Sequence, residues 1–203
     1  WVNASRLKIG NKIHFLSVPV GMPKETKAYM RGYVAGVVRG DGHIGHYEYG
    51  GRRREKDTQN VFRLAVKDKE ILDTTQRFLQ LLGVDCSLRK VHCGPISLAL
   101  ETREAKKVEQ ISEIIHSMES SNDYRRGFLA GIFDAEGTYT KNLTLRIYNR
   151  NQIILGDIAT SLDALGFKFI IEREANRLLG GVSEAIRFFG TTYPRVKRKK
   201  QAI

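Results

Sequence analysis

Leu129-Ala130-Gly131-Ile132-Phe133-Asp134-Ala135-Glu136-Gly137 decides the fold of this chain, because the chain carries a second copy of it. The other copy is Val34-Ala35-Gly36-Val37-Val38-Arg39-Gly40-Asp41-Gly42. Each copy follows a Tyr-x-Arg-Gly approach, at residues 29–32 and 124–127. Self-similarity of this kind predicts two structural units of similar plan.

Each copy is typical of a helix with one face of small residues. These recur at every fourth position: Gly32, Gly36 and Gly40, then Gly127, Gly131 and Ala135. At helical spacing they share one stripe. Glycine costs roughly 1 kcal/mol relative to alanine in a helix interior, but without Cβ atoms two helix backbones can touch. Since the apolar runs are too short to span a bilayer, we predict that the two helices pack on each other inside a soluble protein.

The helix ends carry an acid followed by a glycine. Gly42 and Gly137 predict left-handed caps just past the two helices. In a parallel pair of helices Asp41 and Glu136 would come close, and two close carboxylates repel unless a cation lies between them. Hard oxygen ligands with room for water and phosphate suit Mg²⁺. The alternative is that an acid precedes the glycine by accident, which is weaker for two matched copies than for one.

The paired stretch resembles the LAGLIDADG homing endonucleases, in the monomeric form that carries both motifs on one chain. Ala35-Gly36 with Asp41-Gly42, and the whole second copy, match the motif. The first copy departs at Arg39, where the family usually has an acid matching Asp134; that position is not the metal ligand. The resemblance implies an α+β fold of two pseudo-symmetric αββαββα units. They form a saddle whose antiparallel sheets lie in the DNA major groove.

The rest of the chain fits two such units, at residues 22–119 and 120–203, the second ending in a basic tail. In the first we expect a hairpin tip at residues 52–56 and a helix from the cap Asp68 to Gly83. Strands near 84–92 and 96–101 and a helix near 103–117 follow. In the second, Leu143, Leu145 and Ile147 alternate with polar residues, as in a strand buried on one face. A helix near 151–165 and strands near 167–174 and 183–189 come next, with Gly180-Gly181 as a hairpin turn.

Residues 1–21 form an extended flank that resembles the segment leading from an intein splicing module into its endonuclease domain. An ordinary N-terminal hairpin is an equal alternative. Because the chain begins at Trp1 without a Met, we expect it to be cut from something longer. It lacks the terminal nucleophile and His-Asn end that splicing requires.

The charge balance indicates the class of partner. Net charge is +12, from 34 Lys+Arg against 22 Asp+Glu, which favours nucleic acid first and an anionic membrane surface second. No signal peptide or membrane span is visible. Two cysteines cannot build a disulfide framework or a zinc quartet and fit a reducing cytosol. We expect a cytoplasmic monomer with internal pseudo-two-fold symmetry that binds double-stranded DNA and no membrane.

Several polar side chains are candidates for contacts with DNA. Arginine can bond guanine edges, whereas lysine more often meets phosphates. The alternative is that charged strand faces are simply solvated. The candidates on strand faces, at the hairpin tip and in the tail are Arg63, Lys67, Arg89, Thr144, Arg146, Tyr148, Arg187, Arg52, Arg53, Arg54 and Lys197.

The resemblance also implies the reaction. Members hydrolyse phosphodiesters in both strands of a long asymmetric DNA site across the minor groove, leaving short 3′ overhangs. Asp41 and Glu136, with the carbonyls of Gly40 and Ala135, would hold Mg²⁺ or Mn²⁺. Ca²⁺ would bind without supporting cleavage.

Further groups should orient water and offset charge on the phosphate. Asn149 and its first-unit counterpart Asp68 are expected to orient the water. Lys199, which follows Pro194 as a family lysine does, is expected to offset charge on the phosphate. Residues 117–123 offer no matching lysine in the first unit, so asymmetric pockets could favour nicking one strand.

Two other classes of function stay open. A transcription regulator or intron maturase could keep the scaffold as a catalytically silent DNA- or RNA-binding protein, although such a binder has no need for two retained acids. A membrane-surface protein is a distant third. His43 and His46 are more consistent with an exposed loop than with a metal pair, and Cys86 and Cys93 with packing.

Overall fold

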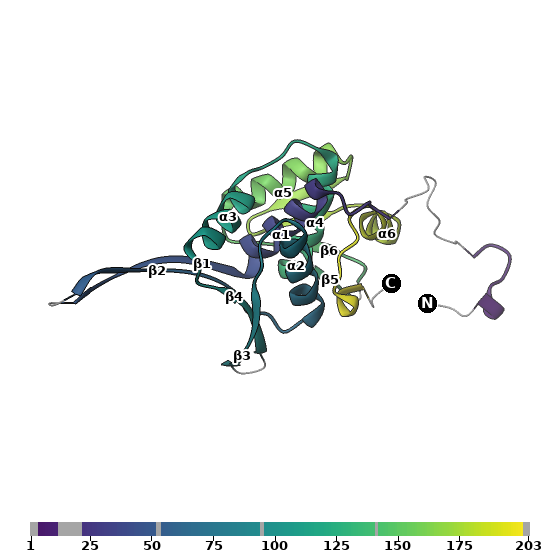
Figure 1. The fold of residues 1–203 in the computed structure, drawn as a ribbon. Helices are drawn as coiled ribbons and strands as arrows, with labels where there is room; N and C mark the ends of the chain where they lie inside the picture. Colours follow the sequence, from purple (N-terminus) through teal and green to yellow (C-terminus); the bar gives the residue numbers. More distant parts are fainter. Residues whose placement is uncertain (1–3, 12–21, 52–53, 94–95, 141, 201–203) are drawn as a thin grey trace.

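The computed structural model describes residues 4–11, 22–51, 54–93, 96–140 and 142–200. Two units of the same plan follow each other along the chain (Figure 1). The first unit contains α1 (Lys27–Asp41), β1 (Gly42–Gly51), β2 (Arg54–Leu64), α2 (Lys69–Leu81), β3 (Ser87–Cys93), β4 (Ile96–Thr102) and α3 (Ala105–His116). The second contains α4 (Asn122–Glu136), β5 (Gly137–Tyr139), β6 (Leu145–Tyr148), α5 (Gln152–Ala164), β7 (Phe169–Glu172), β8 (Ala175–Leu178) and α6 (Gly181–Thr192). Short 3-10 helices, η1 (Ala4–Arg6) and η2 (Lys197–Lys200), lie near the two ends.

Each unit has one four-stranded antiparallel sheet, and the two sheets share a topology. Their strand orders are β1-β2-β4-β3 and β5-β6-β8-β7. The predicted α+β fold of two αββαββα units is therefore confirmed. None of the described helices is long and apolar enough to cross a membrane.

The two motif helices begin in the same way. The side-chain oxygen of Thr26 accepts a hydrogen bond from the Tyr29 amide at the start of α1, and Ser121 does the same for Tyr124 in α4. Such caps satisfy one of the amides left free at a helix N-terminus. The Thr26 hydroxyl also donates to Asp123 at 2.9 Å, so the two helix starts are joined directly.

Each unit has its own core, and the motif helices contribute to both. Ala35 of α1 packs in the core of the second unit, and Ala130 of α4 in the core of the first. Figure 1 shows α1 and α4 side by side at the centre of the molecule. Cys86 is buried in the first core, as predicted.

The first unit carries much the longer hairpin, as the sequence predicts. β1 and β2 pair from Gly42 opposite Leu64 out to Gly51 opposite Arg54, and Figure 1 shows them extending away from the body of the molecule. Arg52 and Arg53, expected at the tip, lie outside the described residues.

The prediction of a strand at residues 183–189 is wrong, because α6 occupies this segment. Its buried residues Ala185, Phe188, Phe189 and Thr192 recur at three- and four-residue intervals, which is helical spacing. Gly180-Gly181 is likewise not a hairpin turn. Gly180 is the N-cap of α6, at a φ of 102°.

Leu143 also departs from prediction. It has a φ of 60° and is exposed, so it lies in the turn before β6 and not on the buried face of a strand. The second sheet is formed by short strands, and only Leu145 and Ile147 of the predicted alternation face the core.

The predicted extended flank falls mostly on residues 12–21, which lie outside the described part of the chain. Before it, the short helix η1 is followed by a turn. There Asn11 accepts a hydrogen bond from the Lys8 amide through its side chain and donates through its own amide to the Lys8 carbonyl.

Candidate functional site

The site is built on the close parallel contact of α1 and α4. A Cβ atom added at Gly32 would lie 2.1 Å from the Tyr124 carbonyl oxygen, and one at Gly131 would lie 2.1 Å from that of Tyr33. The backbones thus touch where the small residues fall, as predicted. Further along, a Cβ at Gly40 would lie 3.2 Å from the Cγ of Glu136. The seam therefore brings the acidic ends of both helices together.

The glycines that follow the acids have another role than predicted. Gly42 and Gly137 have extended backbones, with φ values of −85° and −78°, so they are not left-handed caps. Each leads straight into a strand. A Cβ at Gly137 would lie 2.2 Å from the ring of Phe133, and one at Gly42 2.6 Å from the side chain of Val38. Close approach, and not a positive φ, requires glycine here.

The two acids sit in a partly desolvated environment with one ammonium. Burial raises the pKa of Asp41, Lys199 opposes this shift, and the charge of Asp68 adds to it. Burial also raises the pKa of Glu136, to which Asp41 adds, while Lys199 again lowers it. Because the charge of Asp41 contributes to the raised pKa of Glu136, the two carboxylates lie within electrostatic range of each other.

Lys199 caps the end of α4. Its Nζ donates to the carbonyl oxygens of Phe133, Asp134 and Ala135 at 3.2, 2.6 and 2.9 Å. A cation is favoured at this negative end of a helix dipole. Burial nonetheless lowers the pKa of the ammonium, against the attraction of Asp134. Ala135, a predicted metal ligand through its carbonyl, already has a cationic partner.

The two polar residues predicted to orient water differ in their partners. Asp68 occupies the N-cap position of α2 without bonding a helix amide. It accepts instead from Arg198 Nε and Nη2, both at 2.6 Å, and Arg198 lowers the pKa of Asp68. Asn149 accepts a hydrogen bond from the Asn151 amide at 2.8 Å and has no charged partner of this kind.

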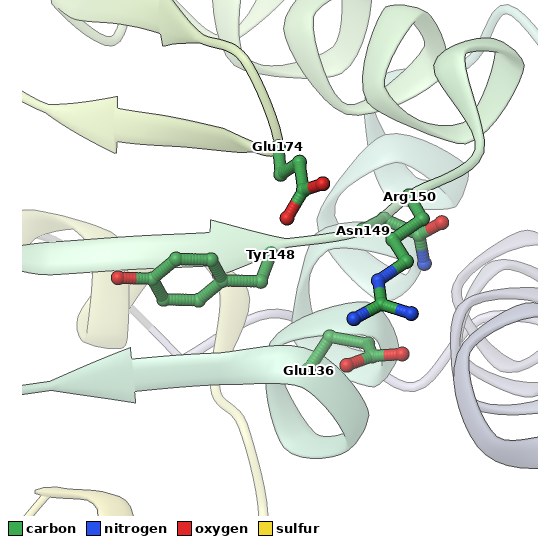
Figure 2. A pocket seen from close by; sticks show the side chains of 5 residues that line it. All are labelled: Glu136, Tyr148, Asn149, Arg150 and Glu174. Atoms are coloured by element: carbon green, nitrogen blue, oxygen red, sulfur yellow. The ribbon is translucent and has the colours of Figure 1, made fainter.

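A hollow of about 420 Å³ opens beside the second acid. It is lined by Glu136, Tyr148, Asn149, Arg150 and Glu174, and Figure 2 shows the guanidinium of Arg150 directed toward the carboxylate of Glu136. Sequence reasoning missed Arg150 and Glu174. The one available signal was that Arg150 directly follows Asn149 at the end of a predicted strand.

Comparison with known proteins agrees with this fold. Residues 123–189 fit the family model of a LAGLIDADG-like domain. No curated protein matches the chain. Among solved structures, mesophilic variants of the homing endonuclease I-DmoI are similar at 18% identity and a TM-score of 0.69, over 87% of this chain and 98% of that one. I-DmoI in complex with DNA and Ca gives 19% identity and a TM-score of 0.68 over the same shares.

The chain has the fold of the LAGLIDADG homing endonucleases, and its second unit matches the LAGLIDADG-like family model. The same fold also matches full-length DUF199/WhiA from Thermatoga maritima, at 11% identity and a TM-score of 0.59, over 90% of this chain and 61% of that one. At these identities the structural likeness concerns the fold, and activity has to be argued from the site.

The outer face of the second LAGLIDADG sheet carries an ordered charged cluster. Arg146 on β6 lies opposite Arg177 on β8. Their Nε atoms donate to the two carboxylate oxygens of Glu172 on β7, at 3.0 and 2.7 Å. Burial alternates along β6, so Arg146 and Tyr148 point away from the core together. Arg177 was missed because no strand was predicted at its position.

The first LAGLIDADG sheet presents a second polar face. Arg63 lies opposite His43 and Glu101, and its neighbours in β2 are fully buried, so its side chain faces outward. Lys67 and Arg89 are exposed, as is Lys197 in η2; Thr144 is partly exposed just before β6. These positions stay predictions of DNA contact.

Two predicted sites on the surface need correction. Arg187 lies on α6 and not on a strand; it pairs with Glu184 and stacks on the ring of Phe167, so it is not part of either sheet face. His43 and His46, which were expected in an exposed loop, lie instead on β1, where residues three apart point to opposite faces. Arg54 begins β2.

Proposed function

We propose that this LAGLIDADG protein is a site-specific DNA endonuclease. It would act as a monomer and, with a divalent cation, hydrolyse phosphodiesters in both strands of a long asymmetric site. The cuts would leave short 3′ overhangs. The observation that carries the proposal is the juxtaposition of Asp41 and Glu136 at the adjoining ends of two helices, each with a raised pKa. A protein that only binds DNA gains nothing from two carboxylates held near a phosphate backbone.

The donor set fits a hard divalent cation. In the described part of the chain no three His, Cys, Asp or Glu side chains gather at one point, so the protein supplies few ligands. Mg²⁺ suits such a site because it keeps several waters and is completed by substrate phosphates. Asp41 and Glu136 would hold it, with the Gly40 carbonyl in the last turn of α1, where helix carbonyls lack intrahelical partners. When bound, the ion would polarise the scissile phosphate.

The chain's own residues would supply the remaining electrostatics. Lys199 lies within electrostatic range of both acids, and Arg150 lines the hollow beside Glu136. Both carry positive charge that a developing phosphorane would meet. Preorganised donors of this kind stabilise the transition state more than the ground state. Asn149 borders the same hollow and can orient a water there.

The experiment is a supercoiled plasmid library of random sites incubated with the protein and Mg²⁺ or Mn²⁺. Asp41→Asn and Glu136→Gln should each abolish cutting while DNA binding stays measurable. Gly156→Ala is a suitable control, because a Cβ there would meet nothing within 4 Å. If both acid variants cut as well as the parent, the assigned roles are wrong.

A second candidate is a catalytically silent DNA- or RNA-binding protein on the same scaffold. The pairing of Asp68 with Arg198 favours it, because it removes one predicted catalytic group from the first unit. In that case the parent would bind nucleic acid, with an affinity that falls steeply with salt, and release no cleaved site from the library with either metal.

A further inference from the structure

The segment after α6 crosses from the second unit onto the first. The carboxylate of Asp134 in α4 accepts hydrogen bonds from the backbone amides of Arg195 and Val196, at 2.7 and 3.0 Å. The Val196 side chain is fully buried in the core of the first unit. The basic segment that the sequence presents as a DNA-binding tail is thus docked at its start, and η2 lies against β5 (Figure 1).

A second anchor holds the segment two residues later. The guanidinium of Arg198 and the carboxylate of Asp68 form two parallel hydrogen bonds of 2.6 Å. Such forked pairs fix orientation as well as distance. Asp68 does not cap its own helix, although capping is the usual use of an aspartate at this position.

Lys199 directly follows this anchor. A lysine side chain has a flexible stem and carries about 2 kcal/mol of rotamer entropy. Here its ammonium nevertheless meets three carbonyls at the end of α4 and lies within electrostatic range of Asp41. The chain leading to its Cα is held at two points just before it, by the buried Val196 and by the pairing of Arg198 with Asp68.

The second unit has no equivalent arrangement among the described residues. Asn149, which matches Asp68 in position, bonds the backbone of its own loop. Among the described residues the paired acid and arginine therefore occur in one half, where they join the second unit's last segment to the start of α2 in the first unit.

We propose that Asp68 and Arg198 form a latch that positions Lys199 at the paired acids. This makes them positioning residues, and neither orients water or binds DNA phosphate. The proposal rests on the proposed endonuclease function for its catalytic part. Its structural part, the docking of residues 195–200, stands without it.

The first test measures docking alone. Trypsin cleaves after Arg and Lys, so it reports the accessibility of residues 195–200 in the free, full-length chain. Asp68→Asn and Arg198→Lys should both speed removal of this segment. Arg198→Lys keeps the charge and the protease site but loses the forked geometry. Asp73→Asn is the matched control, because Asp73 is an exposed acid on the same helix paired with Lys69, and it should leave the rate unchanged.

The second test measures cleavage of a selected DNA site under single-turnover conditions. Both latch variants should lower the cleavage rate by roughly 10- to 100-fold, as loss of a supporting shell does, while DNA affinity stays unchanged. The double variant Asp68→Arg with Arg198→Asp restores an ion pair and should recover part of the lost DNA cleavage rate; it is not used in the trypsin test, because it removes a trypsin site.

Unchanged proteolysis in both latch variants would overturn the proposal. Faster proteolysis with an unchanged cleavage rate would also overturn it, because the latch would then not position Lys199. A parent protein that cuts no DNA would refute the proposed function instead. The proteolysis arm alone would then decide whether the latch exists.

Discussion

Replacing Gly131 with alanine tests the central packing contact of this protein. The new Cβ would lie 2.1 Å from the Tyr33 carbonyl oxygen and 2.9 Å from the Val37 amide nitrogen. Both atoms belong to the backbone of α1, so no side chain can rotate away. An unstrained carbon–oxygen contact needs roughly 3.3 Å or more, and α1 and α4 would have to part by about 1 Å.

The expected effect combines two opposing terms. Overpacking of a core contact costs up to about 3 kcal/mol, and the better helix propensity of alanine returns about 1 kcal/mol. The net loss of about 2 kcal/mol should lower Tm by roughly 4–8 °C for a chain of this length. Gly156→Ala is the matched control in α5, where a Cβ meets nothing within 4 Å, and it should raise Tm by a few degrees because only the propensity term acts.

Thermal unfolding of the two variants and the parent supplies the comparison, with DNA cleavage as a second measurement. Separation of the helices moves Asp41 away from Glu136, so Gly131→Ala should cut more slowly even at temperatures where it is folded. If Gly131→Ala proved as stable as Gly156→Ala, the close helix contact and everything positioned by it would be refuted.

Three further outcomes are expected. Arg77 and Arg195 hold the pKa of Glu25 below its ordinary value, so the ionised form is favoured in the folded state; Glu25→Gln should cost about 1 kcal/mol at pH 7. The difference in unfolding free energy between parent and variant should vanish as the pH falls well below 4.5. Urea unfolding at both pH values measures this difference, and equal stability of parent and variant at pH 7 would contradict the prediction. Tyr33→Phe removes the 2.8 Å donor to buried Asp134 and should destabilise by about 1.5–3 kcal/mol; denaturation showing no loss would argue against that bond. DNA affinity should fall linearly with salt on a logarithmic plot, and a flat titration would exclude phosphate contacts by the basic faces.

Local periodicity in the sequence was enough to predict the seam and most of the elements. The four-residue spacing of small residues has one physical use on a short soluble helix, which is close backbone contact, and Gly36 and Gly131 both make it. Matched acids at the ends of matched helices then follow from parallel packing. Signals of this kind depend on neighbours in sequence, and the structure confirms them.

Glycine was the main source of error, because it serves two purposes that look alike in sequence. Gly42 and Gly137 give room to a side chain beneath an extended backbone. Gly180, which looked like a hairpin turn, supplies a left-handed N-cap. Because of that error, residues 183–189 were predicted to form a strand and Arg187 was predicted to lie on a sheet face. The helical spacing of Phe188 and Phe189 with their apolar neighbours was available evidence against it.

The site was only partly predictable, since its remaining contacts join distant parts of the chain. Arg198 and Asp68 are separated by 130 positions, and no local pattern links them. Lys199 was found through family resemblance, whereas its bonds to the end of α4 depend on the docked segment before it. Arg150 becomes noticeable only when the hollow beside Glu136 is known.

The one departure within the motifs explains why the two halves are not equivalent. In α4 the buried Asp134 is tolerated because the Tyr33 hydroxyl and two backbone amides after α6 bond its carboxylate. At the pseudo-symmetric position of α4, Phe128 takes the place that Tyr33 has in α1, so an acid at position 39 of α1 would lack this hydroxyl donor. Arg39 stands there instead, over the Phe128 ring at 5.4 Å and in an ion pair with Asp157 of α5. Exchange of a hydrogen-bonded acid for an arginine on an aromatic ring keeps the helices joined at both positions. Asp134 also accepts hydrogen bonds from the amides of Arg195 and Val196, whereas an arginine at position 39 cannot accept such bonds. The segment that Asp134 docks in this way is the one that carries Lys199.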